Sequence, residues 1–210
     1  MDFLFQFFFP VRCSGCQAYE SSGFCSVCQN KLPKDTVLFS IPHVLQGAAL
    51  GFYAPPLEQA VRDLKFNHQK IIGKTLGKMV GFMVREKGWD FHCIAPVPMD
   101  KKRWQKRGYN QAEVIGMGVS SVIGKPCKNI LRTIRLVSHQ VGLGRGERLK
   151  NVAGAFGVRE REAVSGRSFL LVDDVVTTGA TLSECAEVLM KSGAESVYAA
   201  CAARDALNQS

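Results

Sequence analysis

Apolar residues in this sequence occur in short runs that alternate with longer stretches of helical periodicity. The runs are bounded by Gly, Pro or polar residues, which is typical of strands. The predicted strands span residues 48–53, 90–95, 127–135, 169–172 and 196–203. Between them, apolar side chains recur at helical spacing over residues 57–64, 71–85 and 182–190. This alternation predicts an α/β fold, an open parallel sheet flanked by helices.

The most informative pattern lies in residues 168–181. Residues 169–172 form a short run that is apolar on both faces, as expected of a buried parallel strand. Two adjacent carboxylates follow, then a loop of small hydroxyl residues with one glycine, and then a helix up to Gly193, which fits a C-terminal cap. Ligands of open parallel sheets bind just beyond the carboxyl ends of strands, so a site is predicted here.

The residue types after this strand suit a ribose phosphate. Backbone N–H groups at a helix N-terminus bind anions, Thr hydroxyls add donors, and a glycine allows close approach. A carboxylate at the end of a strand can accept from the vicinal hydroxyls of a ribose. The predicted binding residues are Asp173, Asp174, Val175, Val176, Thr177, Thr178, Gly179, Ala180 and Thr181. The stretch lacks the Gly-Lys-Ser/Thr ending of a P-loop, and the simpler alternative is an ordinary turn with a solvated acidic pair.

The formal net charge of +9 is concentrated in one part of the chain. Residues 101–150 hold 12 Lys or Arg residues and 2 Asp or Glu residues. Such a concentrated basic region favours a polyanionic partner, and both pyrophosphate and nucleic acid qualify. No apolar run is long enough to span a bilayer, and the aromatic opening, residues 1–10, lacks the features of a signal peptide. We therefore expect a cytoplasmic protein in which this opening docks on the main domain, the alternative being a membrane or partner contact.

Two Cys-x-x-Cys pairs lie near the N-terminus. Four thiolates in this pattern can surround one tetrahedral zinc ion, whereas the alternative is a pair of disulfides. With no export signal the compartment is reducing, which favours zinc in a closed, structural site. The predicted ligands are Cys13, Cys16, Cys25 and Cys28, and their sulfurs should converge even without metal. We predict a zinc-binding module over residues 1–42 and a main domain over residues 43–210.

A basic loop is predicted between the strand at 90–95 and a helix that begins with the capping-box pattern Asn110 to Glu113. Trp104 and Tyr109 are interleaved with its cations, which favours anion binding or base stacking over a solvated loop. Residues 138–151 form a second loop, rich in Gly and Arg, whose spacing does not match a dinucleotide fingerprint. His139 in this loop is a candidate acid or base.

Residues 170–181 closely resemble the phosphoribosyl-pyrophosphate motif of type I phosphoribosyltransferases. The resemblance implies the fold of that family and binding of phosphoribosyl pyrophosphate (PRPP) with Mg²⁺. It implies that the basic loop contacts pyrophosphate, with Arg107 as the first candidate beside Lys101, Lys102 and Arg103. It also implies that residues 138–151 form a lid that shields the site from water. In that loop Arg145, Arg148 and Lys150 are assigned to the lid or to DNA.

Other segments resemble one branch, the ComF/GntX-type competence-associated phosphoribosyltransferases. They are the Cys pairs, residues 64–66, Val97-Pro98 with Arg103, residues 107–111, and Gln140 with Arg148 and Asn151. Tyr109 stands where such chains often carry Phe. The resemblance implies handling of incoming single-stranded DNA during natural transformation, with a DNA-uptake helicase as partner. Two functions stay open: a phosphoribosyltransferase with an unidentified acceptor, and a non-catalytic DNA-binding protein that uses the pocket as a sensor or structural site.

Overall fold

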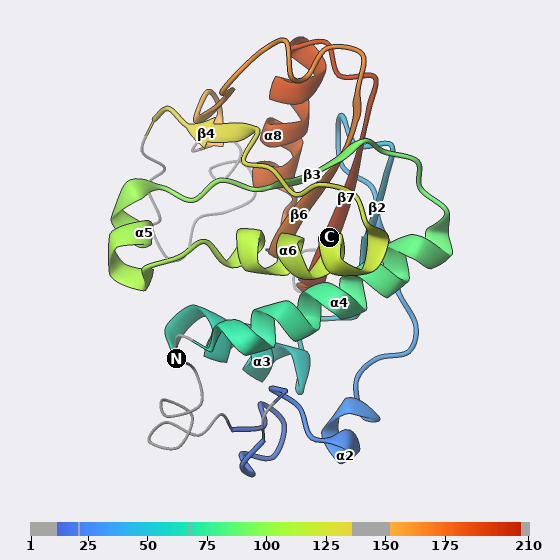
Figure 1. Cartoon of the computed structure of the whole chain (residues 1–210), viewed down its shortest axis with the longest axis vertical. Coiled ribbons are helices and arrows are strands. Elements are labelled where there is room, and N and C mark those ends of the chain that lie inside the picture. Colours follow the sequence, from blue (N-terminus) through green and yellow to red (C-terminus); the bar gives the residue numbers. More distant parts are fainter. Residues whose placement is uncertain (1–11, 21, 68, 136–151, 207–210) are drawn as a thin grey trace.

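In a computed structural model, the chain forms a five-stranded sheet with helices on both faces (Figure 1). The structure describes residues 12–20, 22–67, 69–135 and 152–206. The strand order is β1-β2-β7-β6-β3, in which only the edge strand β1 runs antiparallel to its neighbour. These strands are β1 Val37–Phe39, β2 Gln46–Ala49, β3 Cys93–Pro96, β6 Ser168–Val176 and β7 Ser196–Arg204. The predicted α/β fold with a mostly parallel sheet is confirmed.

The strand β6 lies inside the sheet, paired with β3 on one side and β7 on the other. Both faces are covered: Phe169 and Leu171 belong to one buried cluster, whereas Leu170 and Val172 belong to the other. The strand is longer than predicted, because it stays paired with β7 beyond the acidic pair, as far as Val176. The two carboxylates therefore lie within the carboxyl-terminal part of β6, and rigid pairing fixes their backbone.

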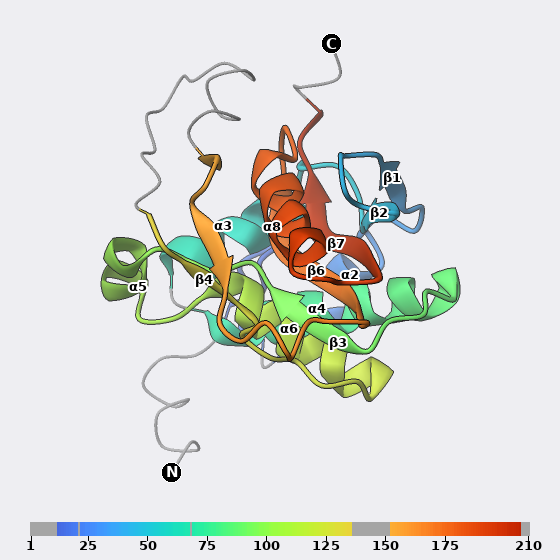
Figure 2. The same ribbon diagram turned by 90° about the horizontal axis from the view of Figure 1, so that it is seen from above.

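Helices cover the two faces unequally (Figures 1 and 2). On one face lie α3 Leu57–Phe66, α4 Lys70–Lys87 and α6 Gln111–Ile123, and on the other lies α8 Ala180–Lys191. The helices α4 and α6 meet at two glycines: a Cβ atom on Gly118 would lie 2.7 Å from the Cα atom of Gly77. Such a close approach leaves no room for a side chain.

Three segments at the margins of the sheet differ from the predictions. The strand β1 lies within residues 1–42, where no strand was predicted, and β2 is shorter than the strand predicted over residues 48–53. The predicted strand at 127–135 is reduced to β4 Leu131–Thr133, which pairs with the unpredicted β5 Phe156–Val158. Cys127 forms only an isolated bridge to Ile94, after which the chain leaves the main sheet. Edge pairings of this kind have too few residues to produce a clear periodicity.

The prediction of a basic loop after β3 was wrong, because most of that segment is the helix α5 Lys101–Arg107. The carboxylate of Asp100 caps the helix by accepting a 3.0 Å hydrogen bond from the N–H of Arg103. Gly108 ends it with a φ of +71°, a conformation that glycine adopts without strain. Lys, Arg and Gln are good helix formers, so the segment forms a helix although none of its side chains is buried.

The cysteine-containing segment, which includes the short helix α2 Ser26–Gln29, packs against α4. Phe24 is buried in the same cluster as Ile72, and the hydroxyl of Thr75 donates a 2.6 Å hydrogen bond to the carbonyl of Ser22. The segment therefore shares a core with the helices beneath the sheet. The strand β1, which precedes the predicted boundary at residue 42, pairs with the main sheet. The division into residues 1–42 and 43–210 stays a prediction.

Several predictions fall on residues 1–11 and 136–151, outside the described residues. They concern the aromatic opening, the lid with His139, Arg145, Arg148 and Lys150, and the matches at Gln140 and Asn151. Within the part of the chain that the structure describes, no helix is both long enough and apolar enough to cross a membrane.

Candidate functional site

A cavity of about 480 Å³ opens at the carboxyl end of β6, where the sequence predicts a site. We call it the main cavity. Its charged lining residues come from α3, from α5 with its cap, and from β6. They are Lys65, Asp100, Arg103, Arg107, Asp173 and Asp174. Three of them are cationic and three are carboxylates, so the cavity offers both signs of charge to one ligand.

The two carboxylates of β6 have different surroundings. Asp174 is buried and forms an ion pair with Lys65, with 2.8 Å between Oδ1 and Nζ. The Oδ1 atom of Asp173 accepts a 2.8 Å hydrogen bond from the N–H of Asp174. Burial, and then the adjacent charge of Asp174, raise the pKa of Asp173 to about 7. Asp173 therefore exchanges a proton near neutral pH, whereas Asp174 is held by a lysine from another element.

The turn after β6 brings the chain to the N-terminus of α8. Gly179 has a φ of +77°, and a Cβ atom there would lie within 2.4 Å of Ile41, so both conformation and space require glycine. The hydroxyl of Thr178 accepts a 3.4 Å hydrogen bond from the N–H of Ala180. Thr181 and Val175 line the main cavity, whereas Val176 and Ala180 are buried in the apolar core. Thr177 and Thr178 are half-buried and do not line the cavity.

The basic helix α5 divides its cations between the cavity and solvent. Arg103 and Arg107 line the main cavity, whereas Lys101 and Lys102 are exposed and do not line it. The Nε atom of Arg103 lies 3.3 Å from Oδ2 of Asp100. Burial lowers the pKa of Arg103, and the charges of Asp100, Asp173 and Asp174 act in the opposite direction. Arg103 and Arg107 are thus the two predicted pyrophosphate residues that the fold brings to the acidic pair.

Lys65, Gln111 and Thr133 also line the main cavity but were not assigned to it from the sequence. Lys65 and Gln111 lie in segments that resemble the ComF branch, but no role was predicted for either residue. The sequence around Lys65 does not indicate that it pairs with Asp174. Thr133 lies at the end of β4, a strand too short to show which side chains share a face. Residue types alone could not have found them, because their position depends on contacts between distant segments.

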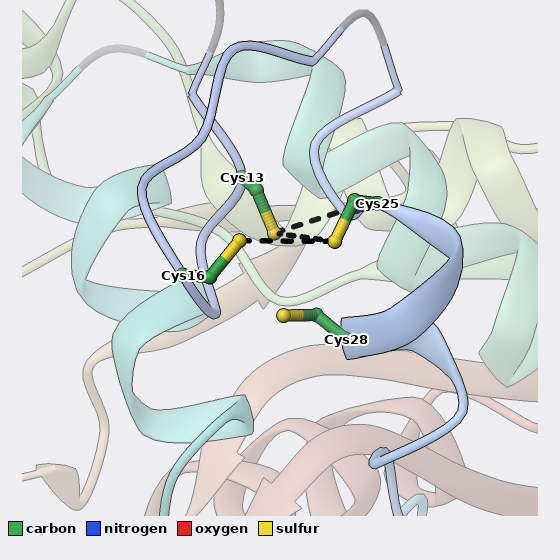
Figure 3. A group of neighbouring side chains, drawn as sticks. All are labelled: Cys13, Cys16, Cys25 and Cys28. Atoms are coloured by element: carbon green, nitrogen blue, oxygen red, sulfur yellow. Dashed lines mark hydrogen bonds between the residues drawn. The ribbon is translucent and has the colours of Figure 1, made fainter.

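The four N-terminal cysteines form a second candidate site, shown in Figure 3. Their sulfur atoms all lie within 4.8 Å of one another, as predicted. The Sγ atom of Cys25 lies 3.7 Å from those of Cys13 and Cys16, too far for a disulfide. A tetrahedron of sulfurs around zinc has edges of about 3.8 Å, from Zn–S bonds of about 2.3 Å. The N–H groups of Gly15 and Cys25 point at the sulfur of Cys13, which suits a thiolate. The donors therefore fit a closed metal site.

Comparison with known proteins agrees with this architecture. Competence protein F of Haemophilus influenzae is 31% identical over 198 residues, which cover 88% of this chain and 86% of that protein. DNA utilization protein YhgH of Escherichia coli is 33% identical over 159 residues, which cover 72% of this chain and 69% of that protein. Among solved structures, a glutamine phosphoribosylpyrophosphate amidotransferase from B. subtilis is similar over 64% of this chain and 26% of its own, at 20% identity and a TM-score of 0.44. That structural similarity is too low to add weight to the sequence matches.

Residues 99–208 match the phosphoribosyl transferase domain family. This range contains the basic helix α5, the acidic pair of β6 and the turn into α8, so it includes most of the charged lining of the main cavity. Two relatives that are each more than 30% identical over most of their length extend the match toward the N-terminus. The chain therefore belongs to the phosphoribosyl transferase domain family, in its ComF-type branch.

Proposed function

We propose that the main cavity binds PRPP with Mg²⁺ and that the protein is a phosphoribosyltransferase whose acceptor is not identified. The observation that carries this proposal is the gathering of Asp173 and Asp174 with Arg103 and Arg107 in the lining of one cavity. PRPP presents a sugar diol and a pyrophosphate at adjacent carbons, so a site for it needs acceptors and cations side by side. The cavity provides both.

In this arrangement different groups of the cavity hold different parts of the ligand. Asp173 and Asp174 accept from the ribose hydroxyls, and the N-terminus of α8, where Thr181 lines the cavity, holds the 5′-phosphate on its N–H groups. The same carboxylates would hold Mg²⁺ with oxygens of the ligand, and the ion would offset pyrophosphate charge. When the bond between the anomeric carbon and pyrophosphate breaks, negative charge grows on the leaving oxygens, and Arg103 and Arg107 stabilise it.

The pH dependence of PRPP binding tests this assignment. The pKa of Asp173 is about 7, and the bound state needs the ionised carboxylate, so a proton must leave before binding at low pH. We expect the affinity measured by calorimetry in Mg²⁺ to rise roughly tenfold from about pH 6 to about pH 8. Asp173→Asn should bind PRPP more weakly, and its affinity should change with pH only through the titration of the phosphates of the ligand. The proposal would be contradicted if the wild-type protein did not bind PRPP in this pH range. It would also be contradicted if the PRPP affinities of the wild-type protein and of Asp173→Asn changed equally with pH.

We further propose that the four cysteines hold a structural zinc ion. Their spacing and the shared core with α4 support it, since a closed tetrahedral site would fix a short segment that has little core of its own. Cytoplasmic location and a DNA-uptake helicase as partner stay predictions.

A second candidate function is binding of single-stranded DNA, as the names competence protein F and DNA utilization protein suggest for the relatives. The observation that favours it is the exposure of α5. Trp104 is 52% exposed, and Lys101, Lys102 and Lys106 are exposed around it. Beside this helix a second hollow of about 310 Å³ is lined by Trp104, Arg132 and Arg159 among others. An aromatic face next to cations suits a base and its phosphates, whether or not the main cavity is catalytic.

Salt dependence separates this candidate from adventitious binding. The logarithm of the affinity for a fluorescent oligothymidylate should fall linearly with the logarithm of the salt concentration, as expected for counterion release. Replacing Lys101, Lys102 and Lys106 with Ala should reduce the slope by roughly two, and Trp104→Ala should cost about 1–3 kcal/mol. The matched control replaces Lys74, Lys78 and Lys87, which are exposed on α4, and loses the same charge elsewhere. Equal slopes for the two triple variants would count against α5.

A further inference from the structure

The wall of the main cavity between α5 and α6 is fixed by Asn110. Its side chain bridges two elements: Nδ2 donates a 2.9 Å hydrogen bond to the carbonyl of Val97, and Oδ1 accepts a 3.1 Å bond from the N–H of Ala112. Gln111 follows as the first residue of α6 and is only 1% exposed, although it is polar and lines the cavity. A buried amide in this position requires hydrogen-bond partners for both of its ends.

Arg107 determines which way that amide is turned. Its Nη1 atom donates a 3.0 Å hydrogen bond to Oε1 of Gln111. A guanidinium group has donors only, so the amide oxygen must face Arg107 and the amide nitrogen must face away from it. The nitrogen, Nε2, is buried and makes no hydrogen bond of regular geometry among the described residues, although the Gln111 side chain interacts with the Tyr109 hydroxyl and this contact partly offsets the rise that burial causes in the pKa of Tyr109. An amide nitrogen carries two hydrogens, so a second one stays available even while the first faces Tyr109. Gln111 therefore holds a donor ready in the lining of the cavity.

A second unpartnered polar atom lies in the same lining. The hydroxyl of Thr133 is buried without a hydrogen-bond partner among the described residues. Four side-chain atoms in the described part of the chain share this property, and the two on Gln111 and Thr133 both line the main cavity. Leaving such a group unsatisfied costs about 1–3 kcal/mol, so their occurrence together indicates that the cavity is built for a polar ligand.

The groups around Gln111 favour an anionic oxygen as the ligand atom. The Nε2 atom of Gln111 can only donate, which excludes a bound cation at that point. Gln111 also begins a helix of 13 residues, whose N-terminus carries partial positive charge, and Arg103 and Arg107 line the same cavity. A ligand oxygen placed here receives a hydrogen bond inside a field that favours negative charge.

We propose that Gln111 donates a hydrogen bond from Nε2 to a phosphate oxygen of the leaving pyrophosphate and is thus a further ligand-binding residue. The inference rests on the proposed function, which assigns PRPP to the main cavity. The 5′-phosphate is assigned to the N-terminus of α8, whereas Gln111 lies at the N-terminus of α6, beside the arginines assigned to pyrophosphate. The 5′-phosphate and the pyrophosphate of PRPP would then be held by the ends of two different helices.

The test compares two ligands and two backgrounds. Calorimetry in Mg²⁺ would measure the affinities of inorganic pyrophosphate and of ribose 5-phosphate for the wild-type protein and for Gln111→Met, which has a similar size and no donor. We expect pyrophosphate affinity to fall roughly ten- to a hundredfold and ribose 5-phosphate affinity to stay unchanged. A loss of ribose 5-phosphate affinity instead would place the contact on the 5′-phosphate and overturn the assignment.

Repeating the substitution in an Arg107→Lys background shows whether Gln111 acts directly. If Gln111 only orients Arg107, Gln111→Met has no further effect once that guanidinium is gone, whereas a direct donor produces the same fold loss in both backgrounds. If Gln111→Met does not fold, Gln111→Glu replaces the donor with a carboxylate and should lose at least as much affinity. Retained affinity in either variant overturns the inference.

The outcomes also separate this inference from the proposed function. If the wild-type protein binds PRPP and Gln111→Met binds pyrophosphate equally well, only the inference fails. If the wild-type protein binds pyrophosphate with a contribution from Gln111 but does not bind PRPP, the proposed function fails and the contact stands. A wild-type protein that does not bind pyrophosphate overturns the inference outright.

Discussion

Replacing both Asp173 and Asp174 with Asn should abolish measurable binding of PRPP in the presence of Mg²⁺. Each carboxylate would lose a charged hydrogen bond to the ribose, worth about 1.5–3 kcal/mol, so the pair accounts for at least roughly a hundredfold in affinity. Loss of the two charges would also remove the groups proposed to hold Mg²⁺. Calorimetric titration of the double variant against the wild-type protein measures the effect directly.

The fold should survive this change. Asp173 and Asp174 are adjacent carboxylates with little exposure to water, and burial already raises the pKa of Asp173 to about 7, so removing their charges relieves repulsion. Asn also keeps an oxygen that can accept from Lys65. A matched control replaces Asp35 and Asp90, both exposed, with Asn and should bind as the wild-type protein does. Undiminished affinity of the Asp173/Asp174 variant would show that the acidic pair does not hold the ligand.

The part of the site that the sequence predicts well is the part that is local. The apolar run of β6, the two carboxylates and the turn at Gly179 follow one another, and each has a separate physical signature in residue type or spacing. The four cysteines are predictable for the same reason, since metal ligands in this pattern need only one short segment to meet. In both cases the chain brings the groups together without help from distant residues.

The rest of the site depends on contacts between segments that are far apart in the chain. Lys65 reaches Asp174 only because α3 packs beneath the sheet, and no pattern around either residue indicates the pair. The helix α5 was missed because none of its side chains is buried, so its apolar periodicity is absent and only the cap at Asp100 signals it. The orientation of Gln111 follows from Arg107 across the turn at Gly108, a relation that spacing alone does not specify.

Loss of the proposed zinc ion from the cysteine site should destabilise more than the segment that contains the four cysteines. Cys13, Phe24, Cys28 and Leu32 are buried in one cluster with residues of α3, α4 and α6, so release of this segment would expose apolar surface on those helices. Structural zinc contributes roughly 10–16 kcal/mol to the folding of isolated fingers. We expect Cys13→Ser to lower the free energy of unfolding by more than about 3 kcal/mol, which for a chain of this size lowers Tm by at least roughly 6 °C.

Metal content and calorimetric melting together decide whether the cluster is a zinc site. The wild-type protein should contain one zinc ion per chain by mass spectrometry, and treatment with a chelator should lower its Tm about as much as Cys13→Ser does. Cys127→Ser is the control, because Cys127 lies outside the cluster and its substitution should leave both zinc content and chelator sensitivity unchanged. A protein without zinc, in which Cys13→Ser and Cys127→Ser melt alike, would show that the convergence of the four sulfurs has no role in stability. The expected result would instead show that one metal ion stabilises the helices α3 and α6, which carry Lys65 and Gln111 in the lining of the main cavity.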